Sequence, residues 1–210
     1  MEFRPVAGHS RQKPTRALES HSICGSLYGY LGYSAAFAVN HLNQYAGWTQ
    51  YGNGSTYRAF RYIGSMSALT PMSGFSHSYG YGIAGDGTVV GVSQNTGGSV
   101  QATKWLPGST TPTDLLDLPS AAGDEHVWAI NNQGRICGKA VVQTGSGATP
   151  SHGFITPASG LNFGSDIGSY AGDDFNSEAL ALDGSGQLVG NTQISFTVTR
   201  PFLKRTSNGT

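Results

Sequence analysis

One pattern of ten residues occurs four times along the chain without gaps, and it constrains the fold more than any other feature. The copies are residues 38–47, 82–91, 129–138 and 181–190. Each begins with a small residue, continues through a polar stretch rich in Asn, Asp and Gly, and ends in a glycine after a short apolar run. The closing glycines are 44, 47 and 52 residues apart. Repeats of this length predict an array of similar supersecondary units that bury their flanks on one another.

Each copy is interpreted as a β-hairpin. Its sixth position is Asn43, Gly87, Gly134 or Gly186, which are residue types that tolerate a left-handed backbone in a tight turn. An apolar strand follows the turn, and the closing glycine indicates a close approach of two backbones or a β-bulge.

A second motif follows each hairpin, at residues 58–62, 101–105, 152–156 and 200–204. In this motif a polar residue precedes a small one and then, in three of the four copies, Phe. The alternation predicts a strand with one buried face. Later stretches, such as residues 113–118, are interpreted as outer strands. Four strands in about 45 residues are typical of one blade of a β-propeller.

The chain is therefore predicted to be all-β, and specifically a small β-propeller of four blades, or five, each with about four antiparallel strands. The repeat units are expected at about residues 33–72, 73–118, 119–168 and 169–204, within one domain spanning residues 22–210. The last unit ends before its outer strand, so residues 22–30 are predicted to supply that strand and close the ring. Two chains forming one larger ring, an open β-solenoid and a sandwich are the alternatives. Residues 1–21 are predicted to be a flexible segment or a cloning remnant.

The composition agrees with short strands and excludes some classes of function. Glycine occurs 31 times and charged residues make up only 11% of the chain, which favours strands and tight turns over helices. Acidic and basic residues number 12 each, so bulk charge does not favour a nucleic-acid partner. The longest clean apolar run, residues 35–39, is far shorter than the ~18 residues of a membrane helix, and no signal peptide is visible. Cys137 lies in an apolar strand pattern and is expected to be a buried thiol, with a disulfide to Cys24 as the alternative.

The two motifs together resemble the HAF-repeat extracellular proteins of bacteria, in which A-I-N-x-x-G-x-x-x-G precedes H-A-F-x-W. Residues 129–138 followed by residues 152–154 are one copy, and residues 58–60 and 200–202 are others, although no copy has His-Ala-Phe intact. The resemblance covers about residues 33–204. It implies a propeller-like fold and a secreted or cell-surface setting in a bacterium, and it implies no particular reaction.

The loops that lead into the first strand of each unit carry most of the groups suited to chemistry, and propellers commonly bind ligands at that face. Carboxylates converging from several units would form a site of hard oxygen ligands that suits Ca²⁺. The predicted metal ligands are Asp124, Glu125, Asp173 and Asp174. Histidines beside them would act as bases near neutral pH, and the predicted catalytic residues are His126, His77 and Glu178. A rim of polar residues that cap turns is the structural alternative.

The aromatic side chains fall into two groups. Trp48, Tyr51 and Tyr57 surround a loop after a hairpin and are predicted to bind a ligand. A second group recurs at the residue that precedes each hairpin copy, and its members are Phe37, Tyr81, Trp128 and Leu180. A recurring apolar column of this kind predicts packing between neighbouring units.

Three classes of function remain open. The first is a secreted or cell-surface binding module for a small molecule, glycan or protein, monomeric or dimeric, without nucleic acid or membrane insertion. The second is a Ca²⁺-assisted hydrolase such as a lactonase or esterase, by analogy with unrelated propellers. The third is a purely structural repeat. No nucleotide, haem or zinc is expected, because the G-x-G-x-x-G stretch at residues 80–85 lies within a strand pattern and neither C-x-x-C nor H-E-x-x-H occurs.

Overall fold

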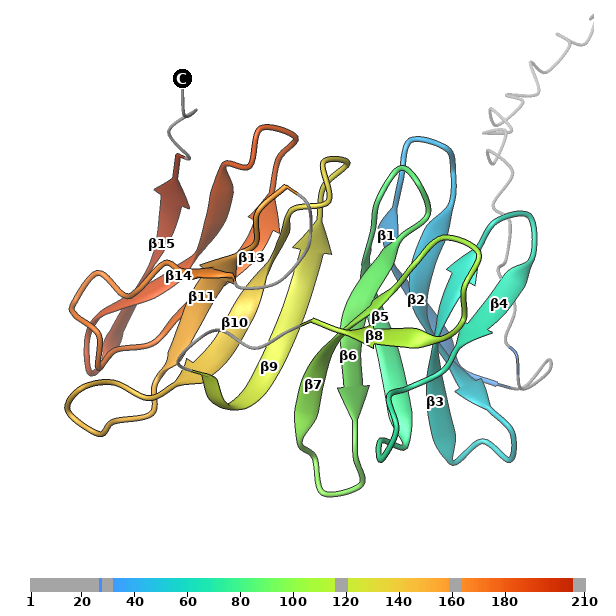
Figure 1. The fold of residues 1–210 in the computed structure, drawn as a ribbon, viewed down its shortest axis with the longest axis horizontal. Helices are drawn as coiled ribbons and strands as arrows, with labels where there is room; N and C mark the ends of the chain where they lie inside the picture. The colour runs from blue at the N-terminus through green and yellow to red at the C-terminus, as the bar shows by residue number, and fades with distance from the viewer. Residues whose placement is uncertain (1–26, 28–31, 116–120, 159–163, 206–210) are drawn as a thin grey trace, which may run out of the picture.

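The computed structural model describes residues 27, 32–115, 121–158 and 164–205. These residues form fifteen strands in four antiparallel sheets, and they contain no helix (Figure 1). The all-β prediction is confirmed. The expected tail at residues 1–21 lies outside the described residues, and so does the expected ring-closing strand at residues 22–30, apart from Leu27.

Each repeat forms one sheet whose strands pair in chain order. The first sheet contains β1 (Ser34–Val39), β2 (Tyr45–Tyr51), β3 (Thr56–Tyr62) and β4 (Met66–Leu69). The second contains β5 (His77–Ile83), β6 (Val89–Gln94), β7 (Val100–Trp105) and β8 (Pro112–Asp114). The third contains β9 (Ala121–Ile130), β10 (Ile136–Val142), β11 (Ser151–Ile155) and β12 (Ser165–Asp166). The fourth contains β13 (Ser177–Leu182), β14 (Leu188–Ser195) and β15 (Val198–Lys204).

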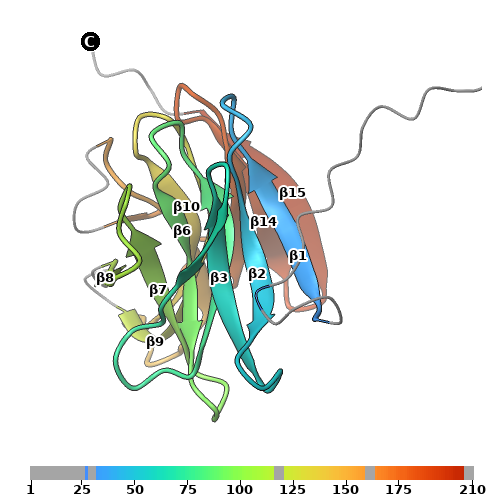
Figure 2. The same ribbon diagram turned by 90° about the vertical axis from the view of Figure 1, so that its right-hand side faces the viewer.

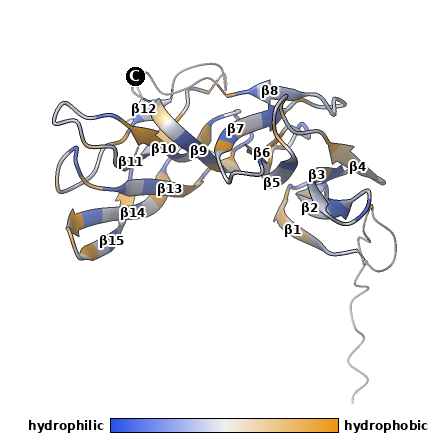
Figure 3. Ribbon diagram, turned by 90° about the horizontal axis from the view of Figure 1, so that it is seen from below, coloured by the Kyte–Doolittle hydropathy of each residue, from blue (hydrophilic) through white to orange (hydrophobic). Residues whose placement is uncertain are grey.

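The sheets are stacked face to face in chain order, and the extensive contacts between sheets join each sheet to the next one. The first strands β1, β5, β9 and β13 contact one another in succession, so they are the inner strands of the stack. Figure 3 shows the resulting arc, with β1 and β15 at its two ends and β8 and β12 along its outer side. Figure 2 looks along the stack from the first sheet. We refer to the interfaces between successive sheets as the first, second and third junctions.

Apolar side chains fill each junction separately instead of forming one central core. The first junction contains Ala46, Ala59, Leu69, Ile83, Val89 and Trp105. The second contains Val90, Ala102, Leu115, Val127, Ile136, Ala140, Val142 and Phe154. The third contains Cys137, Ile155, Ala179 and Leu188. Successive strand residues such as Val89 and Val90 therefore serve opposite junctions, as the alternation of side chains along a strand requires.

Cys137 is a free thiol buried in the third junction, in agreement with the expectation from sequence. Burial raises the pKa of this thiol to about 12. The thiol is therefore protonated at neutral pH and behaves as a small apolar side chain.

The closing glycine of each repeat is required by a β-bulge in the inner strand opposite it. The strand pairings skip one residue in each inner strand, and the skipped residues are Phe37, Tyr81, Trp128 and Leu180. The bulge brings the inner-strand backbone against the glycine. A Cβ placed on Gly91 would lie 1.9 Å from the carbonyl oxygen of Tyr79. The expected close approach of two backbones is confirmed.

The polar hairpin corners also connect neighbouring sheets. The sixth position of each repeat has the predicted left-handed backbone, with φ values of 57° at Asn43, 89° at Gly87, 78° at Gly134 and 87° at Gly186. Asn131 Oδ1 accepts hydrogen bonds from the backbone of Gln133 and Arg135 in its own turn. Its Nδ2 donates across the third junction to the carbonyl of Asp183, at 2.9 Å. Asn40 makes the equivalent bond to Ala84 across the first junction, so the recurring Asn orients neighbouring sheets as well as its own turn.

Candidate functional site

One hydrogen bond recurs at the end of every junction where an inner strand begins. In each case a backbone N–H at the start of the third strand of one sheet donates to a side chain of the next sheet. The bonds run from Tyr57 N to His77 Nδ1 (3.1 Å), from Val100 N to Asp124 Oδ1 (3.1 Å) and from Ser151 N to Asn176 Oδ1 (2.8 Å). His77 and Asp124, predicted as a catalytic base and a metal ligand, therefore occupy equivalent positions and each satisfies a donor of the neighbouring sheet.

A second recurring contact places Glu125 inside the second junction. Ser78 Oγ accepts from Ala59 N at 3.0 Å and donates to the carbonyl of Leu69 at 2.7 Å, and Ser177 Oγ accepts from Gly153 N in the same way. The equivalent residue of the third sheet is Glu125, which is only 3% exposed and accepts from Gln101 Nε2 at 3.2 Å. This predicted metal ligand thus lies within the packing between two sheets.

The predicted ligand-binding aromatics gather at the first junction. The ring of Trp48 meets the ring of Tyr57 edge to face at 5.2 Å and the ring of Tyr79 at 6.3 Å. His77 lies 5.5 Å from Tyr57, and burial, together with the charge of Arg58, lowers its pKa below the ordinary value. Tyr51 lies outside this group of stacked rings, at the exposed end of β2, with the Arg58 guanidinium 5.3 Å from its ring centroid. The half-buried rings contact mainly one another, so this group closes the first junction with apolar packing.

The bulged residues form a row along the inner strands. Phe37 contacts Tyr81 at a ring-centroid distance of 5.5 Å, and Tyr81 contacts Trp128 at 5.1 Å. The predicted packing between neighbouring units is confirmed for these three rings. Phe37 and Leu180, at the two ends of the row, are 54% and 40% exposed.

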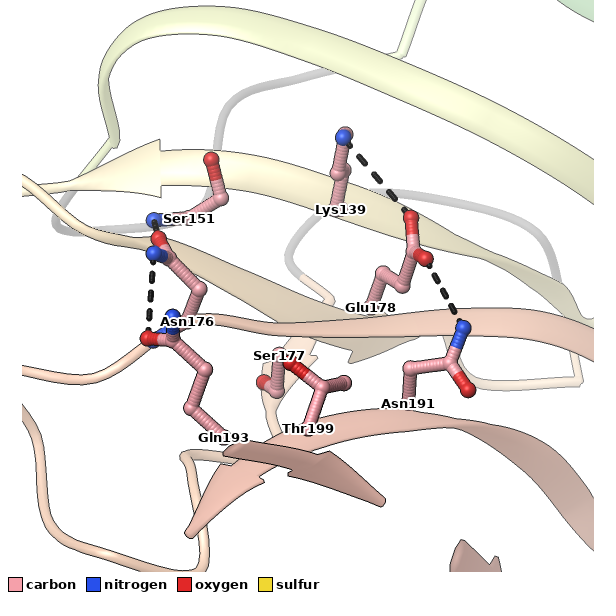
Figure 4. A pocket seen from close by; sticks show the side chains of 8 residues that line it. All are labelled: Lys139, Ser151, Asn176, Ser177, Glu178, Asn191, Gln193 and Thr199. Atoms are coloured by element: carbon pink, nitrogen blue, oxygen red, sulfur yellow. Dashed lines mark hydrogen bonds and ion pairs between the residues drawn. The ribbon is translucent and has the colours of Figure 1, made fainter. Parts of the chain in front are cut away.

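The third junction has a polar pocket at the position where the first junction has aromatic rings. Its volume is about 360 Å³, and it is lined by Lys139, Ser151, Asn176, Ser177, Glu178, Asn191, Gln193 and Thr199 (Figure 4). The lining comes from β10 and β11 of the third sheet, from β13, β14 and β15 of the fourth, and from Asn176, which directly precedes β13. Counted from the closing glycines, Lys139 corresponds to Trp48 and Glu178 to Tyr79. An ion pair and amides therefore replace the ring packing of the first junction.

Two hydrogen-bonded groups hold the pocket in shape. Glu178 lies 3.7 Å from Lys139 Nζ and accepts a hydrogen bond from Asn191 Nδ2 at 3.1 Å. On the other side, Gln193 Oε1 accepts from the backbone and the side chain of Asn176, which in turn accepts from Ser151 N. Figure 4 shows both groups around the pocket. The polar atoms are therefore ordered before any ligand binds.

His126 lies on β9, the strand next to the one that carries the lining residue Lys139. It is the direct cross-strand partner of Lys139, and its ring stacks on Trp128 at 5.3 Å. Its pKa is lowered by burial and by Lys139, with Asp124 and Glu178 opposing the shift. Within the described residues, His126 Nδ1 and Trp128 Nε1 are buried without a hydrogen-bond partner. Such atoms are normally satisfied by a water or a ligand.

The lowered pKa of His126 predicts a loss of stability under mild acid. The folded state favours the neutral ring, so the unfolded state binds more protons once the pH falls below the ordinary value of 6.5. The contribution of the neutral His126 ring to the stability of the folded state is complete above pH 6.5. It is lost as the pH falls towards the lowered pKa of the folded state. Melting temperatures between pH 7.5 and 5.0 should therefore fall less steeply for His126→Gln than for the unchanged chain. The exposed His41→Gln variant is the control, and an unaltered slope in His126→Gln would contradict the assignment.

The remaining predicted acidic residues lie elsewhere. The carbonyl of Asp173 is 2.8 Å from Nε2 of the buried His152, whose Nδ1 is 2.7 Å from Asp166. Asp174 accepts hydrogen bonds from Thr144 and Ser146, and these bonds lower its pKa. In the part of the chain that the structure describes, no three His, Cys, Asp or Glu side chains come together as a metal site would require.

Of the predicted site residues, the structure thus places Glu178 in the pocket and His126 opposite the lining residue Lys139. It brings Trp48, Tyr57 and His77 together at the first junction. Sequence reasoning did not select Lys139, Asn191 or Gln193. A signal for the first two exists, because both directly follow a closing glycine, as Trp48 does.

Comparisons with family models, with curated proteins and with solved structures found no match to this chain. Within the described ranges there is also no helix of the length and apolar character needed to cross a membrane. The function is therefore inferred from the geometry of the site.

Proposed function

We propose that the chain is a binding module of the β-propeller type, related to the HAF-repeat proteins, and that its four sheets are the blades. We further propose that it acts at the cell surface or in secreted form and binds a neutral, hydroxyl-rich ligand such as a glycan. The observation that carries the proposal is the polar pocket of the third junction, where eight polar side chains surround about 360 Å³. The repeated sheets and the resemblance of their motifs support the fold part of the proposal.

The charge balance of the pocket favours a neutral ligand. Among the described residues that line it, Lys139 and Glu178 are the ionisable ones, and they face each other. A phosphate would favour an excess of cationic groups and a metal ion an excess of carboxylates. The remaining lining residues are amides and hydroxyls, which both donate and accept. That mixture complements the hydroxyl groups of a sugar.

Several polar groups are available to a ligand. Within the described residues, the Gln193 amide nitrogen and the Ser151 and Thr199 hydroxyls make no hydrogen bond in the structure. The unpartnered Nδ1 of His126 belongs to the cross-strand neighbour of the lining residue Lys139. A sugar would satisfy such groups without breaking the existing network, which would otherwise oppose binding.

The proposal predicts that Glu178→Gln weakens glycan binding at least tenfold, because a hydrogen bond to a charged group contributes about 1.5–3 kcal/mol. The test is isothermal titration calorimetry with a panel of soluble neutral mono- and oligosaccharides, followed by Glu178→Gln and Asn191→Ala on each sugar that binds. Asp114→Asn is the control, since Asp114 is an exposed carboxylate on β8 of the second sheet. Equal affinities for Glu178→Gln and the unchanged chain, or no sugar bound at millimolar concentration, would exclude this pocket as the glycan site.

A Ca²⁺-assisted hydrolase remains the second proposal. It is supported by His126 and Glu178, which interact electrostatically and are both neighbours of Lys139. The four predicted ligands do not fit a single metal site, because they are distributed among the second junction, the third junction and an exposed loop. No catalytic step through a metal is therefore derived.

A further inference from the structure

The fourth sheet ends with a face and an edge that are covered in the other three sheets. It has three strands, so the outer side of β15 lacks the strand that β4, β8 and β12 provide elsewhere in the described residues. Its Val189 is 46% exposed, whereas the equivalent Ala46, Val90 and Cys137 are all 0% exposed. Its Leu203 is 56% exposed, whereas the equivalent Arg61, Lys104 and Ile155 are 4%, 8% and 9% exposed.

A contact of Leu27 indicates which segment would cover the free edge of β15. Its backbone N–H donates to Thr49 Oγ1 at 3.1 Å. The same bond joins Met72 N to Ser93 Oγ at 3.0 Å and Tyr170 N to Thr192 Oγ1 at 2.9 Å. Met72 and Tyr170 belong to the segments that run from the outer strand of one sheet to the inner strand of the next. Leu27 has this position in front of the first sheet.

The equivalence of Leu27 with Met72 and Tyr170 also aligns the residues before Leu27 with residues of β15. Leu69 and Ile167 lie three residues before Met72 and Tyr170. Leu69 pairs with Ala59, and Ile167 N donates to the carbonyl of Gly153 at 2.9 Å. The residue three positions before Leu27 is Cys24, and the fourth-sheet residue equivalent to Ala59 and Gly153 is Pro201. By sequence spacing, Cys24 therefore has the same position relative to Leu27 as Leu69 has to Met72 and Ile167 to Tyr170.

The reach of the chain decides which copy of β15 is involved. Leu27 is bound to the first sheet, and the three residues to Cys24 span at most about 10 Å. The fourth sheet is separated from the first by two intervening sheets, and packed sheets lie about 10 Å apart. Figure 3 places β1 and β15 at opposite ends of the arc. The segment therefore cannot reach β15 of its own chain in this arrangement.

We propose that residues 21–24 of one chain add to the free edge of β15 in a second copy, so that the first sheet of each copy covers the fourth sheet of the other. Both ends of the arc turn to the same side in Figure 3, so two copies facing each other close one ring. Strand addition satisfies the backbone groups of the β15 edge, and the sheet contact buries Val189 and Leu203.

Two residues deprive this junction of hydrogen bonds that the first and third junctions have. Pro201 has no N–H to donate to Ser34, the counterpart of Ser78 and Ser177. Asp183 replaces the Asn of the first and third junctions and cannot donate to the neighbouring corner. Both losses suit a contact that forms after each chain has folded, and they predict a dimer that dissociates on dilution.

Disulfide trapping tests the register directly. Directly paired residues of antiparallel strands lie about 4.5–5.5 Å apart at Cα, which is within disulfide range. Mild oxidation of Pro201→Cys should therefore give a covalent two-chain species on a non-reducing gel, and Cys24→Ser in the same chain should abolish it. Phe202→Cys is the matched control, because its side chain points to the opposite face of β15. The buried Cys137 should remain unreacted.

Sedimentation of the unchanged chain and of Leu203→Glu provides the second measurement. The unchanged chain should form a two-chain species at micromolar concentration. Leu203→Glu should raise the dissociation constant of that species at least tenfold without lowering the melting temperature of the monomer. A disulfide formed within one chain would overturn the proposal in favour of a four-sheet ring. A monomer at every concentration, or an open series of larger polymers, would also overturn it.

Discussion

Gly91→Ala is expected to destabilise the protein by about 3–5 kcal/mol, near the upper limit for a single substitution. A Cβ at this position would lie 1.9 Å from the carbonyl oxygen of Tyr79 and 3.0 Å from the Cα of Gly80. Both contacts are with backbone, so no side-chain rotation relieves them. The inner strand would have to lose its bulge at Tyr81, and with it the register that places Tyr81 between Phe37 and Trp128.

Urea denaturation of Gly91→Ala and Gly184→Ala measures this effect against a matched control. Gly184 lies in the fourth corner, its backbone does not have a positive φ, and nothing lies within 4 Å of an added Cβ. We expect Gly184→Ala to change the free energy of unfolding by no more than about 0.5 kcal/mol. Equal stabilities of the two variants would mean that the bulge does not require glycine.

Arg61→Ala is expected to cost about 3 kcal/mol, because it removes a buried side chain and the donors of three carbonyl groups, of which that of Gly87 is buried. Arg61 is 4% exposed and crosses the first junction from β3. Its guanidinium donates to the carbonyls of Gly87 at 3.1 Å, Leu106 at 2.8 Å and Ser109 at 2.8 Å. Burial lowers the pKa of Arg61, and the nearby Asp86 opposes that shift.

Three further variants separate the geometry of Arg61 from its charge. Arg61→Lys should recover only part of the lost stability, because one ammonium group cannot reproduce the planar fork that serves three carbonyls. Arg200→Ala is the control, since Arg200 is exposed and donates only to a neighbouring carbonyl. Arg61→Met removes the charge but keeps most of the apolar stem. If Arg61→Met were as stable as the unchanged chain, packing rather than hydrogen bonding would explain the buried position.

The first and third junctions show how one repeat supports two different surfaces. Trp48 and Lys139 have the same position in the first and third repeats, and Tyr79 and Glu178 have the same position in the second and fourth. In the first junction the pair is aromatic and belongs to a group of half-buried stacked rings. In the third it is an ion pair that leaves a pocket. Variation at these positions changes the site while the corners and closing glycines keep the sheets in register.

Much of the fold could be predicted because its determinants are local. The turn residues of each corner require a left-handed backbone, and the apolar runs around them have the period of a strand. The recurrence of the closing glycine indicated the bulge before any partner was known. These features depend on residues within one repeat, so their spacing along the chain was sufficient.

The candidate site was predicted only in part, because it depends on which positions of successive repeats meet. His126 and Glu178 were selected as polar residues of loops that lead into inner strands. Glu178 lines the pocket, and His126 pairs with the lining residue Lys139. His77 and Asp124 were selected on the same ground, but each accepts a backbone hydrogen bond from the neighbouring sheet. A polar side chain in such a loop has the same appearance in the sequence whether it faces a pocket or caps a strand.

The sequence by itself determined the repeated hairpins, their corners and the positions where only glycine fits, since each of these follows from backbone sterics within about ten residues. The tertiary structure decided which side chains meet across the junctions and which face of the fourth sheet is left uncovered. Those outcomes depend on the stacking of whole sheets, and the buried area of that stacking joins residues that no local pattern connects.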